Sequence, residues 1–105
     1  MLTFDEYVTD VLMRDLVGHD RRPVAFLAYV WIAAEQQRRG HAVQISYQDL
    51  AESIGVSKSS AQASVGWLVQ RKLLAVSRTS VTATPNYTAL TPWNPTRKPE
   101  RKSGR

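Results

Sequence analysis

The chain has 105 residues, of which 43 % are hydrophobic, so it can bury one compact core but is too short for two ordinary domains. Its longest apolar run, Val24 to Ala34, falls short of the ~18 residues that a membrane span needs, and the absence of cysteine excludes disulfides and thiolate metal sites. A net charge of +5 suits a polyanionic partner, and no membrane partner is expected because the apolar run is too short.

Charge divides the chain into three parts. Residues 1–20 carry five acidic residues and one arginine, residues 21–93 carry eight basic and three acidic residues, and residues 94–105 carry five basic residues and one glutamate. We therefore expect an N-terminal helix in 1–20, a folded domain in 21–93 and a basic, disordered tail in 94–105. Acids stand where a secretion signal would carry basic residues, which predicts a cytoplasmic protein.

The first predicted helix covers Leu2 to Gly18. Thr3 can cap it, Glu6 stands at the reciprocal capping position, and Gly18 is a natural stop. Helical spacing places its apolar residues on one stripe, so we expect this helix to bind a second copy or another partner. The stripe consists of Phe4, Val8, Val11, Leu12 and Leu16.

A second helix is predicted from Pro23 to Gly40. Proline suits a first helical turn, and the following eleven positions are apolar on every side, which is typical of a central core helix. The segment Ala42 to Ile45 has strand character but is short, so it can only be an edge or a paired strand.

Two further helices are predicted around Gly55. Ser46 caps the first, and Gly55 provides the flexible backbone of a tight turn before Ser57 caps the second. The second helix has an inward face at helical spacing, formed by Ala61, Val65 and Leu68. Two helices joined by a three-residue turn with glycine form a helix-turn-helix.

The residues DLAESIGVSKSSAQASVGWLVQRKLL (49–74) resemble the bacterial winged helix-turn-helix regulators. The segments LLAVSR (73–78) and NYTAL (86–90) are the candidate wing strands around the loop Val81 to Pro85, and PNYTALT is similar to the second wing strand of plasmid-replication and mobile-element proteins. The resemblance covers residues 23–93. It implies an α+β, mainly α fold: a winged helix-turn-helix with an extra N-terminal helix and a two- or three-stranded wing sheet.

The resemblance also implies a recognition helix, residues 58–71, in the major groove of double-stranded DNA, with the wing 74–91 on the backbone. Gln62 has the amide geometry to pair with adenine, and Lys58 stands at the helix entrance. The family often has an arginine near Ala63, so we expect modest base readout and more readout of DNA shape. The predicted DNA-binding residues are Ser57, Lys58, Ser59, Ser60, Gln62, Ala63, Gly66, Arg78, Thr79 and Ser80.

Other residues have less specific interpretations. Trp67 lies off the inward face, so it either packs within the chain or across a dimer, or contacts nucleic acid. Arg71 and Lys72 are either contacts or a solvated helix face. His19 and His41 are isolated and lack the paired spacing of a zinc site, and no catalytic motif is present, so we expect neither an enzyme nor a cofactor.

The sequence therefore predicts a small, cytoplasmic, homodimeric transcriptional regulator that associates with the nucleoid through DNA. The predicted dimer or partner residues are Phe4, Val8, Val11, Leu12 and Trp67. One alternative is a plasmid or phage replication or partition protein with the same wing. Another is a winged-helix adaptor that binds proteins, because a fold does not fix a function. The tail 94–105 either follows the DNA phosphates or has no function, and no effector ligand can be derived.

Overall fold

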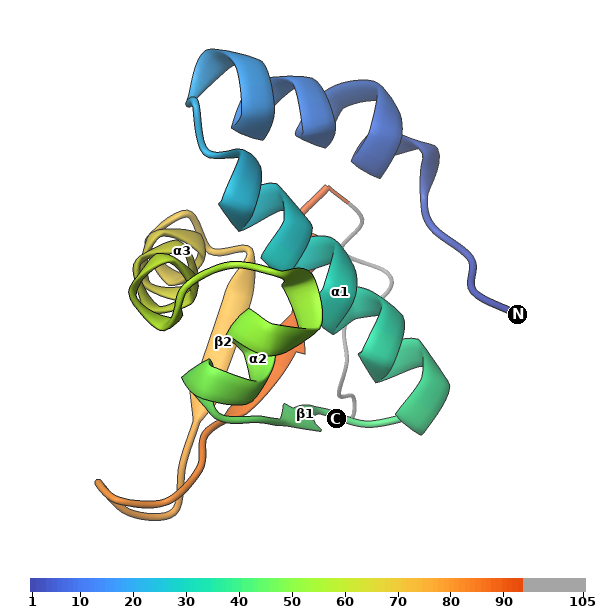
Figure 1. Ribbon diagram of the computed structural model, residues 1–105. Helices are drawn as coiled ribbons and strands as arrows, with labels where there is room; N and C mark the ends of the chain where they lie inside the picture. The colour runs from blue at the N-terminus through green and yellow to red at the C-terminus, as the bar shows by residue number, and fades with distance from the viewer. Residues whose placement is uncertain (94–105) are drawn as a thin grey trace.

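The computed structural model of the chain describes residues 1–93, so the predicted disordered tail 94–105 lies outside the described part. Two short helical segments, η1 and η2, form the N-terminal helix, and three α-helices and three strands follow (Figure 1). The elements are η1 Val8–Leu12, η2 Arg14–His19, α1 Pro23–Arg39, β1 Val43–Gln44, α2 Tyr47–Ile54, α3 Lys58–Gln70, β2 Leu74–Ser77 and β3 Asn86–Ala89. This order confirms the α+β, mainly helical winged helix-turn-helix with an extra N-terminal helix and a three-stranded sheet.

The N-terminal helix has wider turns than an α-helix, because its amides bond five residues back: Asp20 N–H donates to the Asp15 carbonyl at 2.8 Å. The predicted cap is wrong. Asp5, not Thr3, accepts the Tyr7 N–H at 2.9 Å, since Thr3 is instead held by two hydrogen bonds with the Gln37 amide. The predicted stop at Gly18 is also wrong, because η2 continues through it to His19.

The apolar stripe of this helix is buried inside the single chain. Val8 and Leu12 are each 4 % exposed and Leu16 is fully buried, in the same core as α1 and α3. Phe4 packs against that core and Val11 is half-buried. The prediction that Val8 and Leu12 present a dimer surface is therefore corrected: their partner is the remainder of their own domain.

Helix α1 is central, as its apolar composition predicts. It contacts α2, α3, η2, β1 and β3, and Figure 1 shows it running through the middle of the molecule beneath the N-terminal helix. Pro23 stands in its first turn, and Gly40 ends it in the left-handed conformation with φ 77°. Leu27 is the exception on this helix, at 48 % exposed. Within residues 1–93, no helix has the length and apolar character needed to cross a membrane.

The sheet is antiparallel in the order β1-β3-β2. Tyr87, at the centre of β3, pairs with Val43 on one side and Val76 on the other, and its side chain is fully buried. Burial and the neighbouring Tyr47 raise the pKa of the Tyr87 hydroxyl well above its ordinary value. The hydroxyl therefore stays protonated inside the core.

Side chains from α1 close the part of the β3 edge that β1 does not reach. The Gln36 amide oxygen accepts the Ala89 N–H at 2.7 Å, and the Tyr29 hydroxyl donates to the Leu90 carbonyl at 2.8 Å. These two bonds fix the position of α1 on the sheet, and α3 in turn packs against α1 and β2.

Candidate nucleic-acid interface

The helix-turn-helix is built by local capping, as predicted. Ser46 accepts the Asp49 N–H at 3.1 Å and starts α2, which ends at Gly55 with φ 80°. Ser57 then accepts the Ser60 N–H at 3.1 Å and starts α3. Because both caps and the turn glycine are satisfied within the motif, the entrance of α3 is rigidly positioned.

Helix α3 has one buried and one exposed face. Ala61, Val65 and Leu68 are buried, whereas the predicted reading residues lie on the solvent side. That exposed set comprises Ser59, Gln62, Ala63, Gly66 and Gln70. The helix contains no acidic residue, so its exposed face carries nothing that would repel phosphate.

Three serines form a hydrogen-bonded group at the start of α3. The Ser57 hydroxyl donates to Ser60 Oγ at 3.0 Å and lies 3.2 Å from Ser59 Oγ, so Ser57 acts as a cap and organiser rather than as a free contact. Lys58 beside them is exposed and makes no ion pair with any residue in the part of the chain that the structure describes. Lys58 is the first residue of α3, so its positive charge adds to that of the N-terminal end of the helix dipole.

The hairpin β2–β3 is the predicted wing and extends away from the body of the molecule (Figure 1). Arg78, Thr79 and Ser80 are exposed in its loop, and Arg78 Nη1 donates to the Val81 carbonyl at 3.3 Å. Val81 at the tip is 88 % exposed. The wing thus offers one cation and several hydroxyl groups, a set suited to sugar and phosphate contacts.

Trp67 packs within the chain, between two arginines. The guanidinium of Arg71 lies 5.0 Å and that of Arg22 5.7 Å from the ring centroid. Arg71 also forms an ion pair with Asp20, and hydrogen bonds from His19 and then Arg71 hold the pKa of Asp20 below its ordinary value. Trp67 and Arg71 therefore tie the end of α3 to the segment between η2 and α1.

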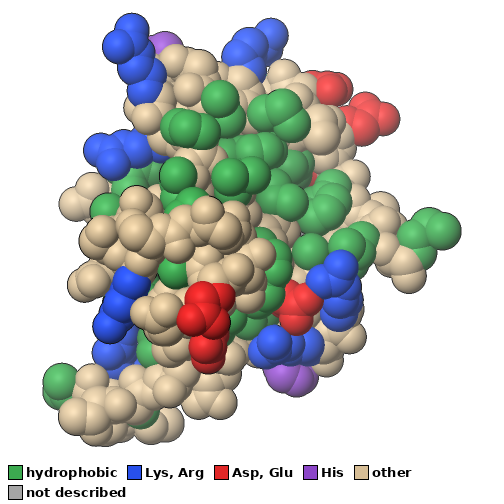
Figure 2. Space-filling model, viewed as in Figure 1, with side chains coloured by type: hydrophobic (Ala, Val, Ile, Leu, Met, Phe, Trp, Pro, Cys, Tyr) green, Lys and Arg blue, Asp and Glu red, His purple; other side chains and the backbone are tan. Residues whose placement is uncertain are grey.

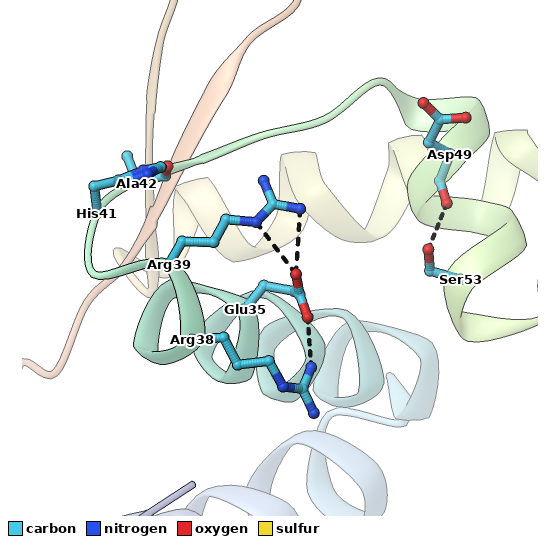
Figure 3. A network of polar contacts seen from close by, with 7 residues as sticks. All are labelled: Glu35, Arg38, Arg39, His41, Ala42, Asp49 and Ser53. Atoms are coloured by element: carbon cyan, nitrogen blue, oxygen red, sulfur yellow. Dashed lines mark hydrogen bonds and ion pairs between the residues drawn. The ribbon is translucent and has the colours of Figure 1, made fainter. Parts of the chain in front are cut away.

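The two arginines that end α1 share one carboxylate, so this cluster keeps one net positive charge. Arg38 and Arg39 both contact the Glu35 carboxylate (Figure 3), the latter at 3.2 Å, and these contacts lower the pKa of Glu35. In Figure 2, several other basic side chains lie on the side on which Figure 1 places α3 and the hairpin, and others lie along the N-terminal helix, where acidic groups are also present. Exposed positive charge is therefore present near α3, with further basic groups at the end of α1 and on the N-terminal helix.

Arg21 and Arg22 are residues that the sequence analysis did not select. Together with the start of α1, they line an open cleft beside Ser60, Ala63 and Ser64 of α3. The sequence does contain a pattern that could have indicated them, because the two arginines directly precede the proline that starts a helix. Their nearness to α3 depends on a tertiary contact between α1 and α3, which no local pattern shows.

Residues 1–93 contain no group of three or more His, Cys, Asp or Glu residues placed to hold a metal ion. The chain matches no protein-family model, no curated protein and no solved structure. The fold and this site therefore define the class of the protein by themselves: a small, mainly helical α+β protein with the element order of a winged helix-turn-helix.

Gly66 provides a test of the exposed α3 face. A methyl group at Gly66 meets no atom within 4 Å, so Gly66→Ala should stabilise the fold by up to about 1 kcal/mol through helix propensity. If duplex DNA approaches the backbone here, the same change should weaken binding several-fold. Urea unfolding and a duplex titration measure the two effects.

Gly18→Ala is the matched control, because Gly18 is also helical and equally unobstructed but lies in η2. It should stabilise the fold without altering DNA affinity. Equal DNA affinity for the Gly66→Ala and Gly18→Ala proteins would contradict a close approach at α3.

Proposed function

We propose that the chain is a small transcriptional regulator that binds double-stranded DNA sequence-specifically, with α3 in the major groove and the β2–β3 hairpin along the backbone. The observation that carries this proposal is the exposed face of α3, which has no acid, little side-chain bulk at Ala63 and Gly66, and at its entrance Lys58, which forms no ion pair within residues 1–93. Such a surface fits the floor of a groove between two phosphate chains.

Each residue of this face has a distinct role in the proposal. The Gln62 amide pairs with the N6 and N7 edge of an adenine, and Ser59 bonds a neighbouring base or phosphate. Ala63 and Gly66 let the helix lie close to the groove floor, so DNA shape supplies part of the specificity. Arg78 and the loop hydroxyls contact the sugar-phosphate backbone beside the groove.

The proposal includes a homodimer, because one recognition helix buries too little surface for tight specific binding. With Val8 and Leu12 inside the core, the apolar residues left exposed on the N-terminal helix are Met13 and Val17, each 40 % exposed, with Leu27 on α1. Figure 2 shows hydrophobic side chains on the surface between the N-terminal helix and α2. These residues replace the predicted stripe as the candidate dimer surface.

A protein-binding adaptor remains the second candidate function. It is favoured by the single cation among the residues of α3 and by the exposed Val81 at the hairpin tip, both of which suit an apolar partner. A replication or partition protein would use the DNA-binding surface in the same way as a regulator, so the two differ in their target and not in the site.

Mobility shift and fluorescence anisotropy with random duplex DNA at 50 and 200 mM salt test the proposal. We expect binding at the lower salt and a loss of about tenfold or more at the higher salt, because several phosphate contacts release counterions. No binding at 50 mM would leave the adaptor. Sedimentation of the complex gives the number of chains per duplex.

Sequence preference is tested by selecting bound fragments with the wild-type, Gln62→Ala and Gln70→Ala proteins. Both glutamines are exposed on α3, but Gln70 is its last residue. A regulator should lose preference at an adenine position with Gln62→Ala and keep it with Gln70→Ala. Identical preferences in all three would contradict readout by Gln62.

A further inference from the structure

The cleft at the start of α1 has a volume of about 200 Å³ and opens to solvent between α1 and α3. Arg21 and Arg22 stand on one side of it, and Ser60, Ala63 and Ser64 on the other. In Figure 1 the start of α1 lies on one side of α3 and the hairpin on the opposite side. A ligand in this cleft would therefore flank α3 on the side away from the wing.

The donors around the cleft suit an oxyanion. No side chain caps the start of α1, so the Val24 and Ala25 N–H groups, which follow a proline without N–H, are available at the positive end of the helix dipole. Arg21 is exposed and pairs with no acid among residues 1–93. Arg22 stacks against Trp67, which restricts its position.

Ser64 is an independent indication of a ligand. It is only 6 % exposed, lines the cleft, and makes no side-chain hydrogen bond with any residue that the structure describes. Because no protein group in the described part of the chain bonds to it, this hydroxyl is free to donate to an oxygen atom bound in the cleft. The Ser60 hydroxyl also keeps its proton available, because its oxygen accepts from Ser57. Two hydroxyl-bearing residues and two arginines thus line one space.

We propose that this cleft binds a backbone phosphate of the duplex whose groove holds α3. This inference rests on the proposed function and adds to it a phosphate anchor opposite the wing, so that α3 is held from both sides. Arg21 adopts φ 58°, a left-handed backbone conformation that non-glycine residues rarely adopt. Asp20, the nearest acid in the chain, is neutralised by its ion pair with Arg71.

The test compares Arg21→Asn with Lys72→Asn in the full chain. Both residues are exposed cations at positive φ, 58° and 61°, which asparagine tolerates, but Lys72 does not line the cleft. Duplex affinity is measured over a range of salt concentrations. Arg21→Asn should weaken binding several-fold and reduce the log-log salt slope by about 0.9, the value for one phosphate. Lys72→Asn should leave the slope unchanged.

Ser64→Ala supplies a second variant that removes only the neutral hydroxyl. We expect it to weaken duplex binding without changing the salt slope, because no charge is lost. If the wild-type protein binds duplex DNA and Arg21→Asn keeps the wild-type slope, or shifts it no more than Lys72→Asn does, the phosphate anchor is overturned while the proposed function stands. If the wild-type protein binds no duplex, the proposed function itself fails.

Titration with inorganic phosphate at constant ionic strength separates a duplex phosphate from a free anion. The amide resonances of Ser60 and Ser64 report on the cleft. We expect half-saturation only above about 10 mM, since one isolated anion lacks the remaining contacts of the duplex. Half-saturation below about 1 mM, with an unchanged DNA salt slope for Arg21→Asn, would assign the cleft to a free anion and overturn the proposal.

Discussion

Leu16→Ala should lower the free energy of unfolding by about 2 to 5 kcal/mol, the range for truncating a fully buried leucine. Leu16 is the deepest residue of the N-terminal helix and belongs to the same core as α1 and α3. Removing its side chain leaves a cavity that the tightly packed surroundings fill only in part. Urea unfolding followed by circular dichroism measures the loss.

Val69→Ala is the control for Leu16→Ala, since Val69 is also helical but is 39 % exposed and lies outside the candidate dimer surface. It should cost well under 1 kcal/mol in a monomer. If the N-terminal helix were a detached dimer arm, Leu16→Ala would weaken association and leave the monomer as stable as before. That result would contradict the core position of Leu16.

Lys58→Glu should weaken duplex binding by about 10- to 100-fold at low salt, because it replaces an attraction for phosphate with a repulsion at the entrance of α3. The free energy of unfolding should not decrease. An acidic side chain in the first turn interacts favourably with the helix dipole, so stability should be unchanged or slightly higher. A loss of DNA affinity without a loss of stability identifies a contact rather than a folding defect.

Lys72→Glu provides the same change of charge at the opposite end of α3. It should weaken binding far less than Lys58→Glu at equal salt. Equal losses would show that only net charge matters, and would contradict the placement of the α3 entrance against DNA.

The features that the sequence predicted correctly are those decided within a few residues. Ser46 and Ser57 cap their helices, Gly55 supplies the left-handed turn, and the spacing of Ala61, Val65 and Leu68 sets the buried face of α3. These features are local hydrogen bonds and side-chain periodicities, so the local sequence is sufficient to predict them.

The features that the sequence did not predict depend on long-range contacts. An apolar stripe shows that a helix has a partner surface but not which one, so Val8 and Leu12 suited a second chain as well as their own core. Arg71 meets Asp20 across 51 positions of the chain, and Thr3 meets Gln37 across 34. The latter contact holds the Thr3 backbone, and the helix is capped two residues later by Asp5.

The covering of the β3 edge by side chains of α1 affects the tendency of the protein to aggregate at high concentration. Unpaired strand edges are templates for intermolecular sheets, and short β1 would leave half of β3 open. The Gln36 side chain accepts the Ala89 N–H that β1 leaves unpaired, so a foreign strand could pair there only after displacing a side chain of the central helix. Strand β2, on the far side of the sheet, is only four residues long. The fold thus resists strand-mediated aggregation at both margins while leaving its helical surfaces free to associate.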